Sequence, residues 1–306
     1  MGKIAFVFAG QGAQYSGMGL DLTMVSPAAA KVFNTLDIIH PGTSYQCFSG
    51  DSKALRDSKN SHPCLFAVDM ACAAALNDIG VKADMVAGYS VGEMAALAYS
   101  GAIDIPSAFR LVHKRSSFMH KAAEFSETSL FAVTRLSNEK VKEICSRFTN
   151  VYPICFNCPG QVLVSGLKEA LPEFVWAVKE AGGKLLPMKN CSSYHSPFML
   201  SASMALAGEA AKYHFNRPNI PVYSNYTGEA YPADIKKMPE YISRQVSSPV
   251  LWERNIRNMI LTGADTFIIL GPSQILGDTI RKINPAVRIY TAADVLGLNT
   301  ILQEVC

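Results

Sequence analysis

The stretch Gly88-Tyr89-Ser90-Val91-Gly92 decides the fold class of this chain. The apolar segment 85–87 precedes it, and residues 93–98, rich in helix-forming side chains, follow it. A serine between two glycines at a strand-to-helix turn is typical of a nucleophile elbow, in which a tight turn exposes the Oγ atom. The free N–H groups at the start of the following helix favour a developing negative charge. We therefore predict a strand, a turn and a helix that present a reactive serine.

The composition is that of a globular chain with a sizeable core. Of its 306 residues, 49% are hydrophobic and 17% are charged, and the net charge is +3. This small charge gives no reason to expect a nucleic-acid or membrane partner. No apolar run reaches the ~20 residues that span a bilayer, and segment 4–8 is too short for a signal peptide, so we interpret it as a core strand. We expect a monomer in the cytoplasm.

The eight cysteines are scattered along the sequence. Cys155 and Cys158 form one C-x-x-C pair, and no second pair follows at the spacing of a zinc site. We expect a structural role for the pair, and no metal. A reducing compartment fits this cysteine usage.

Strands and helices alternate in the first part of the chain. We expect strands at 4–9 and 85–87 and helices at 63–75, 91–99 and 105–121, an order that argues for a parallel sheet covered by helices. Strands at 221–224 and 266–270 and a helix near 197–213 would return to the same sheet. The predicted fold class is α/β.

The pattern changes near residue 126. Strands are expected at 130–133, 161–166 and 184–188, with possible strand pairing at 151–156, and helices at 138–148 and 169–181. This order resembles a small split-βαβ, or ferredoxin-like, unit. We predict a large α/β-hydrolase-like subdomain formed by residues 1–125 and 191–306, with residues 126–190 inserted as the small one.

A serine alcohol at neutral pH needs a base. Of the six histidines, His195 lies in a turn of small residues before a predicted helix, where its side chain can point into a cleft. The alternative is a structural histidine. His62, which precedes Pro63, could face the cleft or cap a helix.

The glycine-rich segment 10–12 follows the first strand. A dinucleotide fingerprint would need glycine at position 15, where Tyr15 stands. Such a loop can instead present a backbone N–H beside the nucleophile. We expect the amides of Gln11 and Val91 to form an oxyanion hole.

Further motifs occur in a fixed order along the chain. They are segments 8–14 (FAGQGAQ), 88–93 (GYSVGE), Lys114-Arg115 with Met119, 157–161 (NCPGQ), 194–196 (YHS), Gln245 with 249–252 (PVLW), and Gly271-Pro272 with Leu276. On these residues the chain resembles the malonyl-CoA:acyl-carrier-protein transacylases, the malonyl-loading acyltransferases of bacterial fatty-acid synthesis. The resemblance spans nearly the whole chain.

The resemblance implies a reaction and its machinery. Malonyl would pass from malonyl-CoA to the phosphopantetheine thiol of holo acyl carrier protein through a covalent acyl-serine, without a tightly bound cofactor. It implies Ser90 as the nucleophile, His195 as the base and the backbone carbonyl of Gln245 as the group that orients the histidine. Arg115 would pair with the malonyl carboxylate, which a guanidinium fork suits. Asn157 would line the site.

Several positions depart from the family pattern. The family usually has histidine at Tyr89, glutamine at His62 and asparagine at Cys155, and segment 192–194 (SSY) is uncommon before the histidine. These changes affect the rim of the acyl pocket, so the exact acyl specificity stays open.

Three other functions stay open on the sequence alone. A serine hydrolase would need an acid, for which Asp104 or Glu124 could serve. A stand-alone acyltransferase of a polyketide synthase would share the chemistry. A degenerate scaffold that only binds the carrier protein would not need Ser90, His195 and Arg115 together.

Overall fold

A computed structural model describes residues 2–125, 127–188 and 192–305. Five strands form its larger sheet: β1 (Lys3–Phe8), β2 (Met85–Gly88), β7 (Val222–Tyr223), β8 (Ala264–Leu270) and β9 (Arg288–Ala292). Their order is β7-β2-β1-β8-β9, and every neighbouring pair is parallel. The predicted parallel sheet is confirmed. Strand β9 was not predicted from the sequence.

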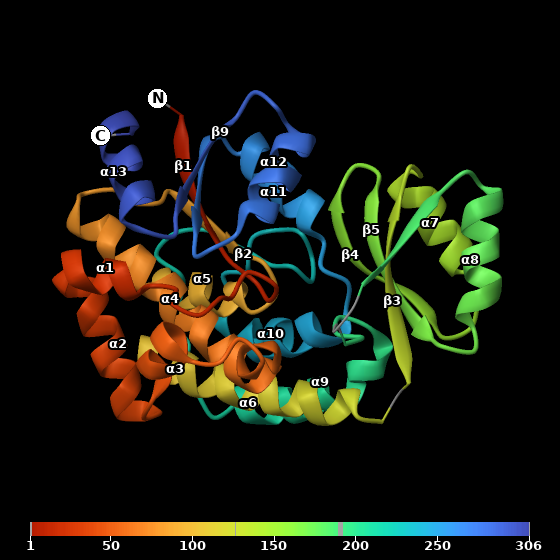
Figure 1. Ribbon diagram of the computed structural model, residues 1–306, viewed down its shortest axis with the longest axis horizontal. Helices are drawn as coiled ribbons and strands as arrows, with labels where there is room; N and C mark the ends of the chain where they lie inside the picture. The colour runs from red at the N-terminus through yellow and green to blue at the C-terminus, as the bar shows by residue number, and fades with distance from the viewer. Residues whose placement is uncertain (1, 126, 189–191, 306) are drawn as a thin grey trace.

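Helices cover both faces of this sheet (Figure 1). The helical elements of the large body are α1 (Leu20–Val25), α2 (Pro27–Ile39), α3 (Thr43–Ser49), η1 (Ala54–Arg56), α4 (Ser58–Asp78), α5 (Gly92–Tyr99), α6 (Ile105–Ala123), η2 (Pro197–Met199), α9 (Leu200–Ala210), η3 (Ile235–Lys237), α10 (Met238–Ser247), α11 (Trp252–Leu261), α12 (Gln274–Ile283) and α13 (Val295–Glu304). Successive side chains of β1 point to opposite faces of the sheet and belong to two different hydrophobic cores. Phe6 and Phe8 pack with α4 and α5, whereas Ala5 and Val7 pack with α11 and α12.

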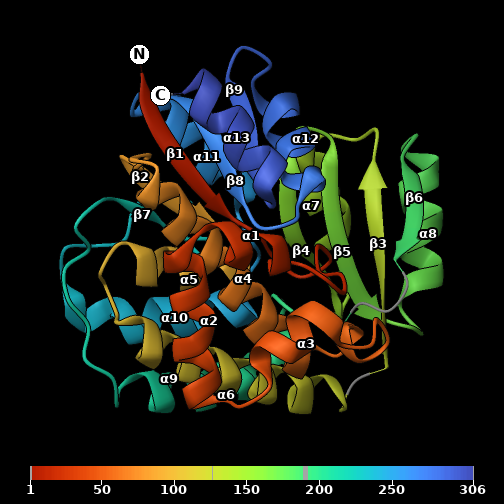
Figure 2. The same ribbon diagram turned by 60° about the vertical axis from the view of Figure 1, so that its left-hand side comes forward.

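A second sheet is built from the middle of the chain. Its strands are β3 (Thr128–Thr134), β4 (Val151–Cys158), β5 (Gln161–Leu167) and β6 (Lys184–Met188), in the order β4-β5-β3-β6 with antiparallel neighbours. Helices α7 (Asn138–Cys145) and α8 (Leu171–Glu180) cover its side away from the large sheet, as Figure 2 shows. The β-α-β-β-α-β order matches the ferredoxin-like prediction. The predicted boundaries at residues 126 and 190–191 lie outside the described residues, and the division into two subdomains stays our interpretation.

Strand β4 attaches this second sheet to the large body. The Phe156 amide donates to the Val250 carbonyl (2.9 Å), and the Val250 amide donates to the Ile154 carbonyl (2.9 Å). Cys155 and Cys158 are both buried on β4, which agrees with the structural role expected for them. The attachment places one face of the small sheet opposite the end of β2.

The end of β1 packs closely against the start of α5. A Cβ atom added at Gly92 would lie 2.4 Å from the Phe8 carbonyl oxygen and 2.5 Å from that of Ala9. Because backbone atoms form both contacts, a larger residue would displace β1 from α5.

We expect Gly92→Ala to lower the free energy of unfolding by about 1–3 kcal/mol, the usual cost of overpacking. The control is Gly208→Ala, in the exposed part of α9, where nothing lies within 4 Å of the added methyl. That control should gain about 0.5–1 kcal/mol through helix propensity. Urea unfolding of the wild type, Gly92→Ala and Gly208→Ala measures both the expected loss and the expected gain of stability. Equal unfolding midpoints for the three proteins would contradict this account of the packing.

Candidate functional site

The serine elbow joins β2 to α5. Ser90 has a φ of 55°, a left-handed conformation that residues other than glycine rarely adopt. A Cβ atom at Gly88 would lie 1.9 Å from the carbonyl carbon of Gly92. The turn therefore requires glycine at position 88, and it directs the Ser90 side chain away from the sheet.

Asn225, from a distant segment of the chain, stabilises this strained turn through two hydrogen bonds. Its Oδ1 accepts from the Ser90 amide (2.7 Å), and its Nδ2 donates to the Gly88 carbonyl (2.8 Å). Asn225 is fully buried, and its own amide donates to a carboxylate oxygen of Glu93 (2.7 Å). Sequence reasoning missed Asn225 because it lies 135 residues from Ser90 and belongs to none of the motifs.

Ser90 and His195 meet although 105 residues separate them. Ser90 Oγ lies 2.7 Å from His195 Nε2, and His195 Nδ1 lies 2.8 Å from the Gln245 carbonyl oxygen. Arg115 Nη2 donates to Ser90 Oγ at 3.2 Å. Because a guanidinium cannot accept, the Ser90 proton points to a bare Nε2, and Nδ1–H donates to Gln245. The hydroxyl of Ser90 is therefore placed to transfer its proton to the imidazole of His195.

The acids considered for a hydrolase triad lie elsewhere. Asp104 caps α6 by accepting from the Ser107 amide (2.8 Å), and Glu124 lies 3.4 Å from the ring of His120. The His195 nitrogen that an acid would contact is occupied by a backbone carbonyl. The geometry therefore gives neither carboxylate a part in a triad.

Arg115 is a fully buried cation. Its Nη2 donates to Gln245 Oε1 at 2.8 Å, and Gln245 Nε2 in turn donates to the Ser90 carbonyl (2.7 Å) and to Glu93 Oε2 (3.1 Å). Burial lowers the Arg115 pKa to about 10, so the guanidinium stays charged at neutral pH. Within residues 2–125, 127–188 and 192–305, no carboxylate forms an ion pair with it. The site thus contains a positive charge without an anion in contact.

His195 is a neutral imidazole. Burial, and then the Arg115 charge, lower its pKa to about 3, although the Gln245 carbonyl favours the charged form. Glu93, buried nearby, has its pKa raised by burial. At neutral pH the site therefore presents a free base beside the serine.

Ser90 opens into a cavity of about 350 Å³ between the two sheets. The cavity is lined by Gln11, Gly12, Gln14, Arg56, Tyr89, Ser90, Leu130, Ile154, Cys155, Leu163, Ser192, Tyr194 and His195. Its lining residues come from the loop after β1, from Arg56 in η1, from the elbow, from segment 192–195 and from the face of the small sheet opposite the elbow. Of the predicted site residues, Arg115, Val91, Gln245 and Asn157 lie behind this lining rather than in it.

The loop after β1 packs directly on the elbow. A Cβ atom at Gly10 would lie 2.5 Å from the Tyr89 carbonyl oxygen, and the Tyr89 amide donates to the Phe8 carbonyl (3.0 Å). In the part of the chain that the structure describes, neither the Gln11 nor the Val91 amide donates a hydrogen bond. Both amides are available to an oxyanion beside Ser90.

The residues that depart from the family pattern lie at the site. Tyr89 donates its hydroxyl to Asn157 Oδ1 (2.7 Å), and its ring meets the edge of Trp252 at a centroid distance of 5.4 Å. Asn157, which we expected to line the site, is not among the described lining residues, and its hydrogen bond to Tyr89 connects it to the cavity. His62 lies deeper, against Gln11 and Arg115. It does not cap a helix, one of the two roles considered for it.

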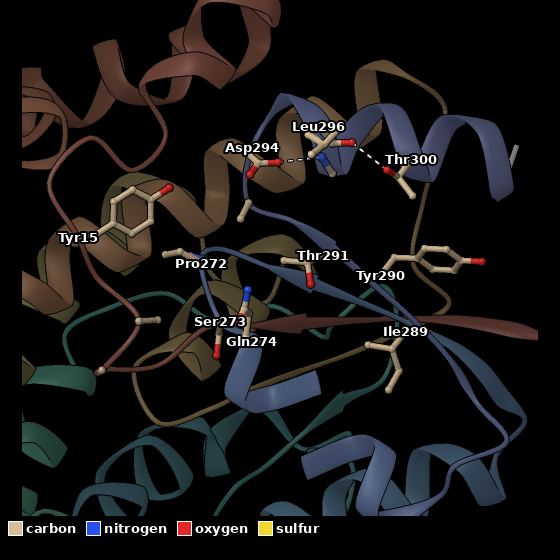
Figure 3. Close-up of a pocket in the computed structure, with 14 residues that line it drawn as sticks. Tyr15, Pro272, Ser273, Gln274, Ile289, Tyr290, Thr291, Asp294, Leu296 and Thr300 are labelled. Atoms are coloured by element: carbon tan, nitrogen blue, oxygen red, sulfur yellow. Dashed lines mark hydrogen bonds between the residues drawn. The ribbon is translucent and has the colours of Figure 1, made fainter. Parts of the chain in front are cut away.

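A larger cavity, of about 640 Å³, lies at the carboxyl ends of β8 and β9 (Figure 3). It is bounded by Tyr15, by the loop 272–274 and by the start of α13. Asp294 is the only charged side chain among its described lining residues, and it caps α13. No nucleophile and base meet there, so the smaller cavity is the candidate active site.

None of the described helices combines the length with the apolar composition that a membrane span requires. No group of three or more histidine, cysteine or acidic side chains among the described residues is arranged to hold a metal ion.

The neutral state of His195 has a consequence for stability. Because the folded protein binds this proton less tightly than the unfolded chain, stability falls as pH drops below the unfolded pKa of 6.5, and it continues to fall to about pH 3. From pH 7 to 5 this histidine should remove roughly 2 kcal/mol. We expect His195→Gln, which does not titrate, to lose that much less over the same interval in urea unfolding. Identical pH dependence of the two proteins would contradict the lowered pKa.

Comparisons with known proteins agree with this geometry. The acyl transferase domain family matches residues 5–295. The malonyl CoA-acyl carrier protein transacylase of Bacillus subtilis (strain 168) is 31% identical over 316 residues, covering 99% of each chain. A crystal structure of the transacylase of that name from Clostridium perfringens ATCC 13124 superposes with a TM-score of 0.95, at 33% identity, over 99% of this chain and 97% of its own.

A further solved structure is a complex. It is described as a type II PKS acyl-carrier protein bound to its malonyl-transacylase, and it is 28% identical with a TM-score of 0.93, over 98% of this chain and 99% of that one. The chain belongs to the acyl transferase domain family, and its resemblance to the malonyl-CoA:acyl-carrier-protein transacylases is confirmed.

Proposed function

We propose that this enzyme transfers a malonyl group from malonyl-CoA to the phosphopantetheine thiol of an acyl carrier protein. The observation that carries the proposal is the buried Arg115 guanidinium, which lies 3.2 Å from the nucleophile and has no described carboxylate in contact. An unpaired buried cation is costly, and an acyl group with its own carboxylate offsets that cost. The substrate and the carrier protein in this proposal are those that the names of the relatives above give.

The transfer proceeds in two half-reactions. Ser90 Oγ attacks the thioester carbonyl while its proton moves to His195 Nε2, and the amides of Gln11 and Val91 receive the oxyanion. The carbon–sulfur bond breaks, and the CoA thiolate leaves with the proton from His195. The carrier thiol then attacks the acyl-serine, gives its proton to Nε2, and Ser90 Oγ recovers that proton as it leaves. Gln245 accepts from Nδ1–H throughout.

The geometry differs from a Ser-His-Asp triad in one respect. His195 is oriented by the Gln245 carbonyl at 2.8 Å rather than by a carboxylate. No tightly bound cofactor has a part in the proposed steps. The monomeric state and the cytoplasmic location stay predictions.

Malonyl-CoA alone should add one malonyl group to the protein, on Ser90, and the group should persist until a carrier thiol is supplied. Intact-mass spectrometry before and after addition of holo acyl carrier protein measures both steps. Ser90→Ala should show no adduct. Labelling that survives in this variant would refute the nucleophile, and loss of the adduct in buffer alone would favour a hydrolase.

Truncation of Arg115 separates a malonyl transferase from a general acyltransferase. Arg115→Ala should reduce kcat/KM for malonyl transfer by at least ~10²-fold, or about 2.7 kcal/mol, because the carboxylate is left unpaired. Acetyl transfer should stay level or rise. Arg115→Lys should restore only part of the malonyl activity, since an ammonium lacks the planar fork. A malonyl-to-acetyl ratio that does not fall in Arg115→Ala would exclude the proposed clamp.

A further inference from the structure

His62 lies between two parts of the site that have separate tasks. It belongs to α4 and is 1% exposed. Its Nε2 lies 2.9 Å from the side-chain oxygen Oε1 of Gln11, and its Nδ1 lies 3.4 Å from Arg115 Nη1. One imidazole therefore bridges the loop that carries the Gln11 amide and the guanidinium beside the nucleophile.

The chemistry of these two neighbours determines which nitrogen of His62 carries the proton. A guanidinium only donates, so Nδ1 accepts and carries no hydrogen. In the neutral ring the proton then lies on Nε2, which donates to the Gln11 oxygen. The ring is held in a single tautomer, because the other one would place two donors face to face at Arg115.

The surroundings of His62 disfavour a second proton. The charged and titratable groups that face the ring are Arg115 from α6 and His195, and the Tyr194 ring lies at a centroid distance of 6.2 Å. Burial, then Arg115 and His195, hold the pKa of His62 well below its usual value of 6.5. A proton on Nδ1 would also point at the guanidinium. His62 therefore remains an uncharged bridge over the neutral pH range.

The other partners of Arg115 hold only one end of its fork. Nη2 donates to Ser90 Oγ and to Gln245 Oε1. Nη1 contacts His62, and Nε has no hydrogen-bond partner among the described residues. His62 is thus the one described side chain that fixes the Nη1 side of the guanidinium plane.

We propose that His62 is a positioning residue for acyl selection: it orients the Arg115 guanidinium toward the carboxylate of the acyl group and couples that clamp to the Gln11 loop. The inference rests on the proposed function and extends it to a residue outside the cavity lining. It predicts a separable effect, because the Arg115 contact serves only acyl groups that carry a carboxylate, whereas the Gln11 contact serves every acyl group.

Three variants test the proposal. His62→Phe keeps a ring but removes both contacts, and it should reduce kcat/KM for malonyl-CoA by at least ~10-fold, mostly through KM, and for acetyl-CoA by less than ~3-fold. His62→Gln offers an acceptor to Arg115 and a donor to Gln11, so it should recover most of the malonyl preference. The matched control is His113→Phe, two residues from Arg115 on α6, whose ring packs against His40 and Phe109 instead. It should leave the malonyl-to-acetyl ratio unchanged.

A spectroscopic measurement is independent of activity. In ¹⁵N-histidine-labelled protein, the signal that disappears in His62→Gln should report a neutral ring with the proton on Nε2 from pH 7.5 down to about pH 5.5. Protonation on Nδ1, or titration near pH 6.5, would overturn the bridge. The result does not depend on which acyl group the enzyme transfers.

The kinetic outcomes distinguish this inference from the proposed function. If His62→Phe loses malonyl and acetyl transfer equally, or loses neither, His62 does not act through Arg115, although acyl-Ser90 formation from malonyl-CoA would still support the reaction. If wild type forms no acyl-Ser90 from malonyl-CoA, the proposed function fails, while the tautomer measurement still tests the bridge. A folded His62→Gln variant without malonyl preference would also overturn the positioning role.

Discussion

A buried guanidinium without a carboxylate in contact is the interaction on which the site depends. Arg115 donates to the nucleophile and to Gln245 and contacts His62. Burial first, and then the Arg115 charge, lower the pKa of His62 and of His195. A carboxylate placed beside it would weaken that field, so His195 would become a stronger base when a charged acyl group is bound. A neutral acyl group would leave the field unchanged. Selection of the substrate and the strength of the base are therefore coupled through one cation.

Backbone strain places the nucleophile within reach of that cation. Ser90 and His195 both have left-handed φ values, of 55° and 63°. Such conformations persist only where the surroundings fix them. Asn225 holds the elbow, and the Val246 carbonyl accepts from the His195 amide at 2.9 Å. Segments far apart in the sequence thus fix the two reacting side chains at their 2.7 Å contact.

The sequence predicted the elements that a local signal marks. The elbow, the strands of the small sheet and the helices at 63–75 and 105–121 follow from periodicity and glycine placement, whereas β9, with only partly buried residues along most of its length, lacks the apolar pattern of a core strand. Ser90 and His195 were identifiable from their turns. The Gln245 carbonyl came only from the family resemblance, because a backbone group has no residue signature. Asn225 and the bridging contacts of His62 depend on the tertiary fold, and no pattern along the chain indicates them.

The two walls of the cavity, one from the small sheet and one from the large body, differ in chemistry. The small sheet contributes mainly apolar side chains, among them Leu130, Ile154 and Leu163, and Tyr89 is braced by Asn157 and Trp252 at the rim. The polar groups that act on the acyl carbonyl all belong to the large body. The apolar side chains and Tyr89 discriminate between acyl groups by shape. The Arg56 guanidinium also lines the cavity, whereas Arg115, behind the lining, is the cation in hydrogen-bond contact with Ser90. The unusual rim residues can therefore alter which acyl groups fit while the Arg115 contact that favours a carboxylate is retained.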